Sequence, residues 1–85
     1  MWIRSQDDRL LIDADKIFVS KKCDSKYEIF NIGETYNHTL GFYSSLDKAM
    51  RVMDEIHGNL NEFDLEGTVV YQMPNDENVE LYEDV

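Results

Sequence analysis

The chain has 85 residues with 18 acidic and 8 basic side chains, which gives a formal net charge of −10. Its hydrophobic content of 42 % is too high for a disordered chain, and its length allows a single domain with one core. The single cysteine, Cys23, excludes an internal disulfide framework. The negative charge excludes general electrostatic binding to nucleic acid or to an anionic membrane, because both require an excess of Lys and Arg.

The first half of the chain predicts short β-strands joined by polar turns. Runs that are rich in β-branched and aromatic residues indicate such strands. They cover residues 2–5, 10–12, 16–20, 26–32 and 38–43. The short connections favour antiparallel neighbours, and residues 21–25 are predicted to be one of these connections. From the strands, the core is expected to contain Trp2, either Ile29 or Phe30, Leu40 and Phe42.

After residue 43 the apolar period changes from two to about 3.6 residues, which predicts an amphipathic helix over about 45–61. Ser44 is the expected N-cap, and Asp47 can complete a capping box. Gly58 leaves an earlier helix end open. The apolar stripe consists of Leu46, Ala49, Met53, Ile56, Leu60 and Phe63. Residues 68–72 predict a final strand, which Met73 and Pro74 end.

These elements predict an α+β fold, in which an antiparallel β-meander of about four to six short strands packs against one amphipathic helix. The expected domain spans residues 1–74, and residues 75–85 form an acidic tail. Two states of this tail stay open. It is either disordered or docked as an edge strand through residues 79–82, on its own sheet or on that of a partner.

The sequence contains no pattern that is typical of an active site or a metal site. Cys23 lies beside two lysines that could favour its thiolate, but neither His38 nor His57 has the context of a catalytic base. His57 follows Asp54 by one helical turn, which indicates a surface pair or a histidine at the edge of the core, and metal-ligand motifs are lacking. The four glycines are isolated and form no phosphate loop. We therefore expect a non-enzymatic protein without a cofactor or a metal.

The charge is distributed unevenly along the chain. All eight basic residues lie in residues 1–51, where eight acidic residues balance them, and residues 52–85 contain ten acidic residues and no Lys or Arg. Such asymmetry is typical of an interaction surface, although a solvated face that keeps the protein soluble has the same composition. The first interpretation predicts that the C-terminal third binds a basic protein surface.

Two sets of acidic residues are the predicted binding residues. The acidic face consists of Asp54, Glu55, Glu62, Asp64 and Glu66. The tail adds Asp76, Glu77, Glu80, Glu83 and Asp84. Nucleic-acid mimicry, in which carboxylates replace phosphates on a host protein, is the sharpest form of this hypothesis. The alternative is an accessory module that binds through a sheet edge or an aromatic patch, with Trp2, Tyr43 and Tyr82 as candidates.

Three stretches of the sequence resemble a family of short uncharacterised bacterial and prophage proteins. They are Met1-Trp2-Ile3-Arg4-Ser5-Gln6-Asp7, residues 40–49 with 52–56, and Tyr71-Gln72-Met73-Pro74 before the acidic end. The resemblance implies a mobile element, where small acidic proteins commonly block host proteins such as defence nucleases. It implies no catalytic residue. Since the opening residues lack a basic stretch followed by an apolar run, we expect the cytoplasm as the location, with no membrane anchor.

Overall fold

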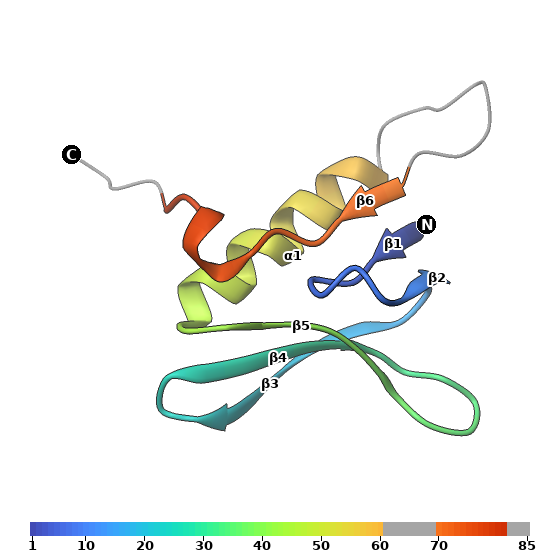
Figure 1. Ribbon diagram of the computed structural model, residues 1–85, viewed down its shortest axis with the longest axis horizontal. Helices are drawn as coiled ribbons and strands as arrows, with labels where there is room; N and C mark the ends of the chain where they lie inside the picture. Colours follow the sequence, from blue (N-terminus) through green and yellow to red (C-terminus); the bar gives the residue numbers. More distant parts are fainter. Residues whose placement is uncertain (61–69, 82–85) are drawn as a thin grey trace.

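The computed structural model describes residues 1–60 and 70–81, which form one helix and six strands (Figure 1). The strands are β1 (Trp2–Arg4), β2 (Leu11–Asp13), β3 (Ile17–Cys23), β4 (Lys26–Asn31), β5 (His38–Tyr43) and β6 (Val70–Gln72). The helix α1 spans Leu46–Leu60, and a short 3-10 helix, η1, spans Asp76–Asn78. The predicted α+β fold with strands packed on one amphipathic helix is confirmed.

The strands form two sheets instead of one continuous meander. β3, β4 and β5 form an antiparallel sheet in chain order. In the second sheet β1 is central and pairs antiparallel with β2 and parallel with β6. The parallel pair departs from the predicted antiparallel arrangement, because β1 and β6 are separated by the other sheet and the helix, so no short hairpin sets their relative direction.

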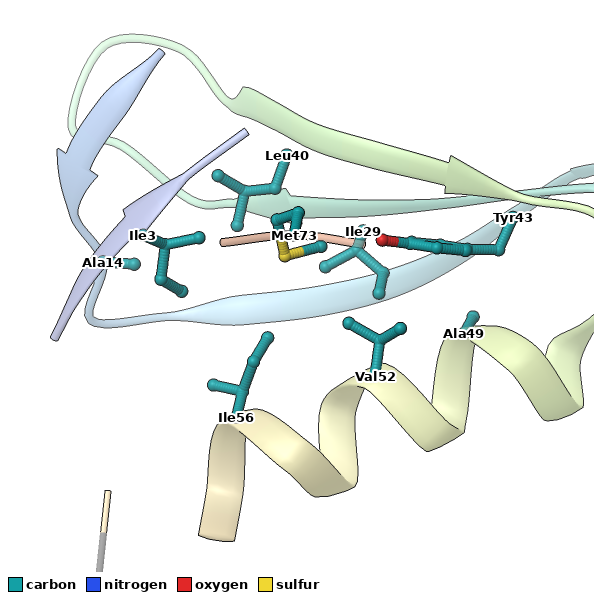
Figure 2. Close-up of a cluster of buried hydrophobic side chains, with 9 residues drawn as sticks. All are labelled: Ile3, Ala14, Ile29, Leu40, Tyr43, Ala49, Val52, Ile56 and Met73. Atoms are coloured by element: carbon teal, nitrogen blue, oxygen red, sulfur yellow. The ribbon is translucent and has the colours of Figure 1, made fainter. Parts of the chain in front are cut away.

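The core lies between α1, one face of the β3–β4–β5 sheet, and the strands β1 and β6 (Figure 2). Figure 2 shows Ala49, Val52 and Ile56 pointing from the helix toward Ile29 of β4 and Ile3 of β1. These five side chains are almost completely buried. Burial of an aliphatic side chain of this size stabilises the fold by about 1.5–3 kcal/mol, so this layer supplies the main driving force for folding.

Three predicted core residues, Trp2, Phe42 and Leu46, are exposed. Trp2 is 40 % exposed, and its neighbour Ile3 takes the inward position of β1, because successive side chains of a strand point to opposite faces. Leu46 lies in the first turn of α1 and is also exposed, whereas Val52 lies inside the core. Among residues 46–58 of the helix, the buried side chains are therefore Ala49, Val52 and Ile56, with Met53 partly buried.

A β-bulge corrects the prediction for β5. The register with β4 steps from the pair Ile29–Gly41 to the pair Phe30–Thr39, so Leu40 is the extra residue. Alternation is interrupted there, and Leu40 and Tyr43 both lie in the core while Phe42 points outward. A strict period of two placed Leu40 and Phe42 together and Tyr43 on the opposite face, which is wrong for this strand.

Two boundaries also differ from the prediction. The hydroxyl of Ser45 accepts the Lys48 N–H at 3.2 Å, so Ser45 caps α1 and Ser44 does not. The strand β3 continues through the expected polar connection as far as Cys23, because its partner β4 begins at Lys26 and extends the hairpin across a second bulge. The helix bounds agree with the predicted range to within one residue at each end.

The side chain of Gln6 joins three parts of the fold. Its amide accepts the Phe42 N–H and donates to the Phe42 carbonyl, both at 2.9 Å, as a neighbouring strand would. It also donates to the Pro74 carbonyl at 3.2 Å, and the Gln6 N–H donates to the Leu40 carbonyl at 2.7 Å. Gln6 thereby occupies the edge of β5 that faces away from β4, and its bonds to Leu40 and Phe42 stabilise the bulge.

Candidate interaction surface

The predicted acidic face is only partly within the described residues. Asp54 lies exposed on α1, and Glu55 follows it on the same helix, half-buried. The remaining members, Glu62, Asp64 and Glu66, lie outside the described residues. The structure therefore describes one exposed carboxylate of this set, that of Asp54, and the binding role of the set stays a prediction.

Glu55 connects the helix to β6. Its carboxylate accepts a hydrogen bond of 2.8 Å from the Tyr71 hydroxyl and lies 3.7 Å from Nε of Arg51. Burial raises the pKa of Tyr71, and the hydrogen bond to Glu55 raises it further, so the hydroxyl keeps its proton and donates throughout the physiological range. Within this arrangement Glu55 holds α1 against β6.

Asp76 of the predicted tail is bonded to the start of the helix. Its carboxylate accepts the Ser44 N–H at 2.7 Å and the Ser44 hydroxyl at 3.0 Å, and it lies 3.5 Å from Nζ of Lys48. Burial pushes the pKa of Asp76 upward, but the Ser44 hydrogen bonds and the Lys48 charge outweigh it and hold the pKa below its usual value. Ser44, expected as the helix cap, thus binds Asp76.

The remaining tail residues differ in whether they pack against the core, face solvent or lie outside the described residues. Val79 packs against the core, while Glu77 and Glu80 are exposed. Residues 79–81 are not part of a strand, so the docking of this segment occurs through Asp76 and Val79. Glu83 and Asp84 lie outside the described residues. Of the tail set, Glu77 and Glu80 are therefore the described acids that face solvent.

The outer face of the β3–β4–β5 sheet, opposite to α1, carries three phenylalanines. Phe18 and Phe30 are paired across β3 and β4 and stack with ring centroids 6.2 Å apart. Phe42 lies on the same face, and Nζ of Lys26 is 4.3 Å from its ring centroid. Phe18 is 52 % exposed and Phe42 38 %. We call this set of phenylalanines the phenylalanine face.

A small polar group lies within this face. The Glu28 carboxylate accepts a hydrogen bond from the Thr39 hydroxyl and forms an ion pair of 3.0 Å with Lys22. Burial raises the pKa of Glu28, but these two partners together with the charge of Lys26 lower it below the usual value. Lys22 and Lys26 outnumber Glu28, so this face is basic in a chain whose net charge is −10.

The phenylalanine face was missed by the sequence analysis, although its signal is present in the sequence. Phe18, Phe30 and Phe42 each alternate with an aliphatic or small residue that lies on the inner face. The inner face of these strands is thus apolar, and the outer face combines the three phenylalanines with polar residues such as Glu28 and Thr39. The aromatic candidates Trp2 and Tyr43 lie elsewhere: Trp2 on β1, and Tyr43 buried in the core with its hydroxyl donating to the Pro74 carbonyl.

β3 is an edge strand of its sheet. Within the described part of the chain it pairs with β4 alone, whereas Gln6 occupies the corresponding edge of β5. The Ile32 N–H donates to the Lys16 carbonyl, and hydrogen-bonded and non-hydrogen-bonded pairs alternate along an antiparallel ladder. The N–H and C=O groups of Ile17, Val19 and Lys21 therefore point away from β4.

A pocket of about 430 Å³ lies beside the beginning of β3. Its apolar lining includes Ile17 of β3 with Met53 and Ile56 of α1, and Asp15 and His57 contribute polar groups. Pockets of this size are large enough for an aromatic or aliphatic side chain. The edge of β3 thus has the phenylalanine face on its outer side and this pocket on its inner side.

The residues considered for chemistry are dispersed. Cys23 is a free, exposed thiol at the end of β3, and His57 is exposed near the end of α1. Among residues 1–60 and 70–81, no group of three or more His, Cys, Asp or Glu side chains is arranged to hold a metal ion. In the same part of the chain, no helix has the length and apolar character needed to cross a membrane.

Comparisons with protein-family models, with curated proteins and with solved structures found no match. The resemblance to short bacterial and prophage proteins therefore stays a prediction. What the chain binds has to be inferred from its own surface, where an aromatic, basic face and exposed acidic residues occur on different elements.

Proposed function

We propose that this chain is a non-enzymatic protein-interaction module that binds a partner through the phenylalanine face. The observation that carries the proposal is the exposure of Phe18 and Phe42 on a sheet whose other face is already covered by α1. Exposed aromatic side chains that gather on one face are typical of binding surfaces, because water is a poor solvent for them.

The chemistry of this face favours a protein partner. Phe18 is 52 % and Phe42 38 % exposed, so burial of the remaining area of each ring contributes about 0.5–1.5 kcal/mol to association, before the cost of fixing the two molecules together. Lys22 and Lys26 add a positive charge that attracts acidic groups and contributes specificity. A double-stranded nucleic acid requires several Lys or Arg contacts to its phosphates, and this face offers two lysines, of which Lys22 is paired with Glu28.

Affinity capture from an extract of the native cell tests the proposal. The variant Phe18→Ser/Phe42→Ser removes the rings from the face, and Trp2→Ser/Leu11→Ser is the matched control, because both of its side chains are exposed on the other sheet. We expect a protein that is captured by the wild type and the control and lost with the first variant. Equal capture by both variants would contradict the proposal.

A second candidate function is the binding of a basic protein surface by the acidic C-terminal third. It is favoured by the exposure of Asp54, Glu77 and Glu80 and by the lack of Lys and Arg in residues 52–85. In its sharpest form the chain is a nucleic-acid mimic that inhibits a host nucleic-acid-binding protein, such as a defence nuclease. Acidic surfaces of this kind accelerate association with basic partners and bind weakly at high salt.

Charge neutralisation separates the two candidates. The variant Asp54→Asn/Glu62→Gln/Asp64→Asn/Glu66→Gln removes acidic charge and leaves Glu55, which bonds Tyr71. If the second candidate is correct, this variant loses a partner whose binding by the wild type falls steeply between about 0.05 and 0.3 M salt. If the partner still binds the neutralised variant, and binds the wild type equally well at high salt, the second candidate is rejected and the phenylalanine face is left as the binding surface.

A further inference from the structure

We infer that the free edge of β3 receives an extended, acidic segment of a partner protein as an additional strand. This inference rests on the proposed function and names both the mode of binding and the chemistry of the partner. An exposed sheet edge binds an extended peptide through main-chain hydrogen bonds, and the neighbouring side chains provide specificity.

The main-chain groups of β3 are arranged for such pairing. The N–H and C=O groups of Ile17, Val19 and Lys21 point away from β4, whereas those of Phe18 and Ser20 point toward it. The opposite edge of the sheet is occupied by Gln6, which bonds both backbone groups of Phe42. Within the described residues, β3 is thus the edge of this sheet that can accept another strand.

The charge around β3 selects an acidic segment. Lys16, Lys21, Lys22 and Lys26 are four of the eight basic residues of the chain, and they lie on β3, just before it or at the start of β4. Lys21 pairs with Asp24 at 3.3 Å and Lys22 with Glu28 at 3.0 Å, so these two charges are partly neutralised. The four lysines still exceed the neighbouring Asp15, Asp24 and Glu28 by one positive charge. Lysines on an edge strand also prevent two copies from pairing through the same edge, because like charges would face each other. The same residues therefore oppose a second copy and attract a partner that carries Asp and Glu.

The side chains beside the edge require apolar residues in the partner as well. Side chains of an added strand alternate between the two faces of the sheet. On the outer face they meet Phe18, which stacks on Phe30. On the inner face they meet the pocket lined by Ile17, Met53 and Ile56. The expected segment has apolar residues at its centre and acidic residues at its ends.

A labelled synthetic peptide, Asp-Glu-Asp-Val-Phe-Val-Phe-Glu-Asp-Glu, is the probe for this site, and fluorescence anisotropy measures its binding. Lys21→Pro removes an outward N–H and one charge, and Lys21→Gln is the matched control that removes the charge alone. We expect Lys21→Gln to weaken binding about twofold to threefold and Lys21→Pro about tenfold or more. A peptide with Lys in place of every Asp and Glu should not bind.

Amide hydrogen exchange gives a readout that does not depend on any variant. In the peptide complex, exchange at Val19 and Lys21 should slow, while Phe18 and Ser20, which already bond to β4, should change little. Equal slowing at all four residues, equal binding of the lysine peptide, or equal affinity of the two Lys21 variants would overturn the inference. A concentration-dependent dimer that Lys21→Pro abolishes would also overturn it, because the edge would then bind a second copy.

The failure of this inference differs from the failure of the proposed function. If Phe18→Ser/Phe42→Ser loses the captured partner while Lys21→Pro retains it, the phenylalanine face binds without strand addition. In that case the proposed function stands and the added strand is rejected. If capture is the same for both variants and for the wild type, the proposed function itself is rejected.

Discussion

The two faces of the β3–β4–β5 sheet both carry large apolar side chains, but only one of the faces is covered by the helix. Ile29, Leu40 and Tyr43 on the inner face pack under α1 and are almost completely buried, while Phe18 and Phe42 on the outer face contact solvent. Hydrophobic patterning alone therefore does not distinguish them. What distinguishes them is the helix, which covers one face and leaves the other with apolar side chains that the core does not use.

Among the variants that compare the two faces, truncation of an inner side chain is expected to lower the free energy of unfolding most. Leu40→Ala leaves a cavity beneath the helix, and we expect a loss of about 2–4 kcal/mol in the free energy of unfolding, measured with urea. Leu11→Ala is the matched control, because Leu11 is 53 % exposed and should lose less than about 1 kcal/mol. Equal losses would mean that the inner face is not the core.

Removal of the Gln6 amide should have the next largest effect on the free energy of unfolding, since the edge of β5 then loses the hydrogen bonds that Gln6 makes to Phe42. Gln6→Ala loses the two bonds to Phe42 and the bond to Pro74, and we expect a loss of about 1–2 kcal/mol in unfolding free energy. Asn75→Ala serves as the control, because the Asn75 side chain is exposed. An unchanged stability of Gln6→Ala would show that the bulge at Leu40 holds without this side chain.

Protonation of Asp76 should have a smaller effect. Because its pKa is lowered in the folded state, Asp76 stabilises the fold above its ordinary pKa of 3.8, and this contribution is lost as the pH falls below that value. Asp76→Asn should cost about 0.5–1 kcal/mol near neutral pH after allowance for solvent screening, and the difference from the wild type should shrink in acid. Thermal unfolding at several pH values measures it, with Glu77→Gln as the control. If the stability difference between the wild type and Asp76→Asn does not depend on pH, the ionised Asp76 carboxylate does not stabilise the fold through its bonds to Ser44.

The smallest expected effect is on the outer face. Phe18→Ser should change the unfolding free energy by no more than about 0.5–1 kcal/mol, because Phe18 is 52 % exposed and loses mainly its stacking on Phe30. Urea unfolding measures this change beside that of Leu40→Ala. A loss as large as that of Leu40→Ala would mean that another part of the protein covers the outer face in solution.

Local patterns in the sequence predicted the fold class and most element bounds. The helix was predictable because its apolar spacing and the serines before it are local signals. The pairing of β6 with β1 was not, because it depends on contacts between residues 2–4 and 70–72. The bulge at Leu40 was equally hidden, since nothing in residues 38–43 shows that Gln6 bonds Phe42. One inserted residue reversed the expected faces of Phe42 and Tyr43.

The candidate site was less predictable than the fold. Counting charges located the acidic third of the chain, but it could not show that Asp76 bonds Ser44 or that Glu55 bonds Tyr71. The phenylalanine face was overlooked because Phe30 and Phe42 were considered as core candidates and Phe18 was not considered, and only the position of α1 decides which face is covered. Burial on one side of a sheet is a tertiary property, which alternation within a strand does not determine.

The parallel pair of β1 and β6 has a consequence for folding during synthesis. Ile3 of β1 packs in the same buried cluster as Met73, which follows β6, and the Met73 N–H donates to the Arg4 carbonyl. The β3–β4–β5 sheet, the β1–β2 pair and α1 form through contacts close in sequence and can assemble early, whereas the second edge of β1 pairs only with a segment translated nearly seventy residues later. Synthesis of β6 and Met73 is therefore the step that completes this sheet and the core.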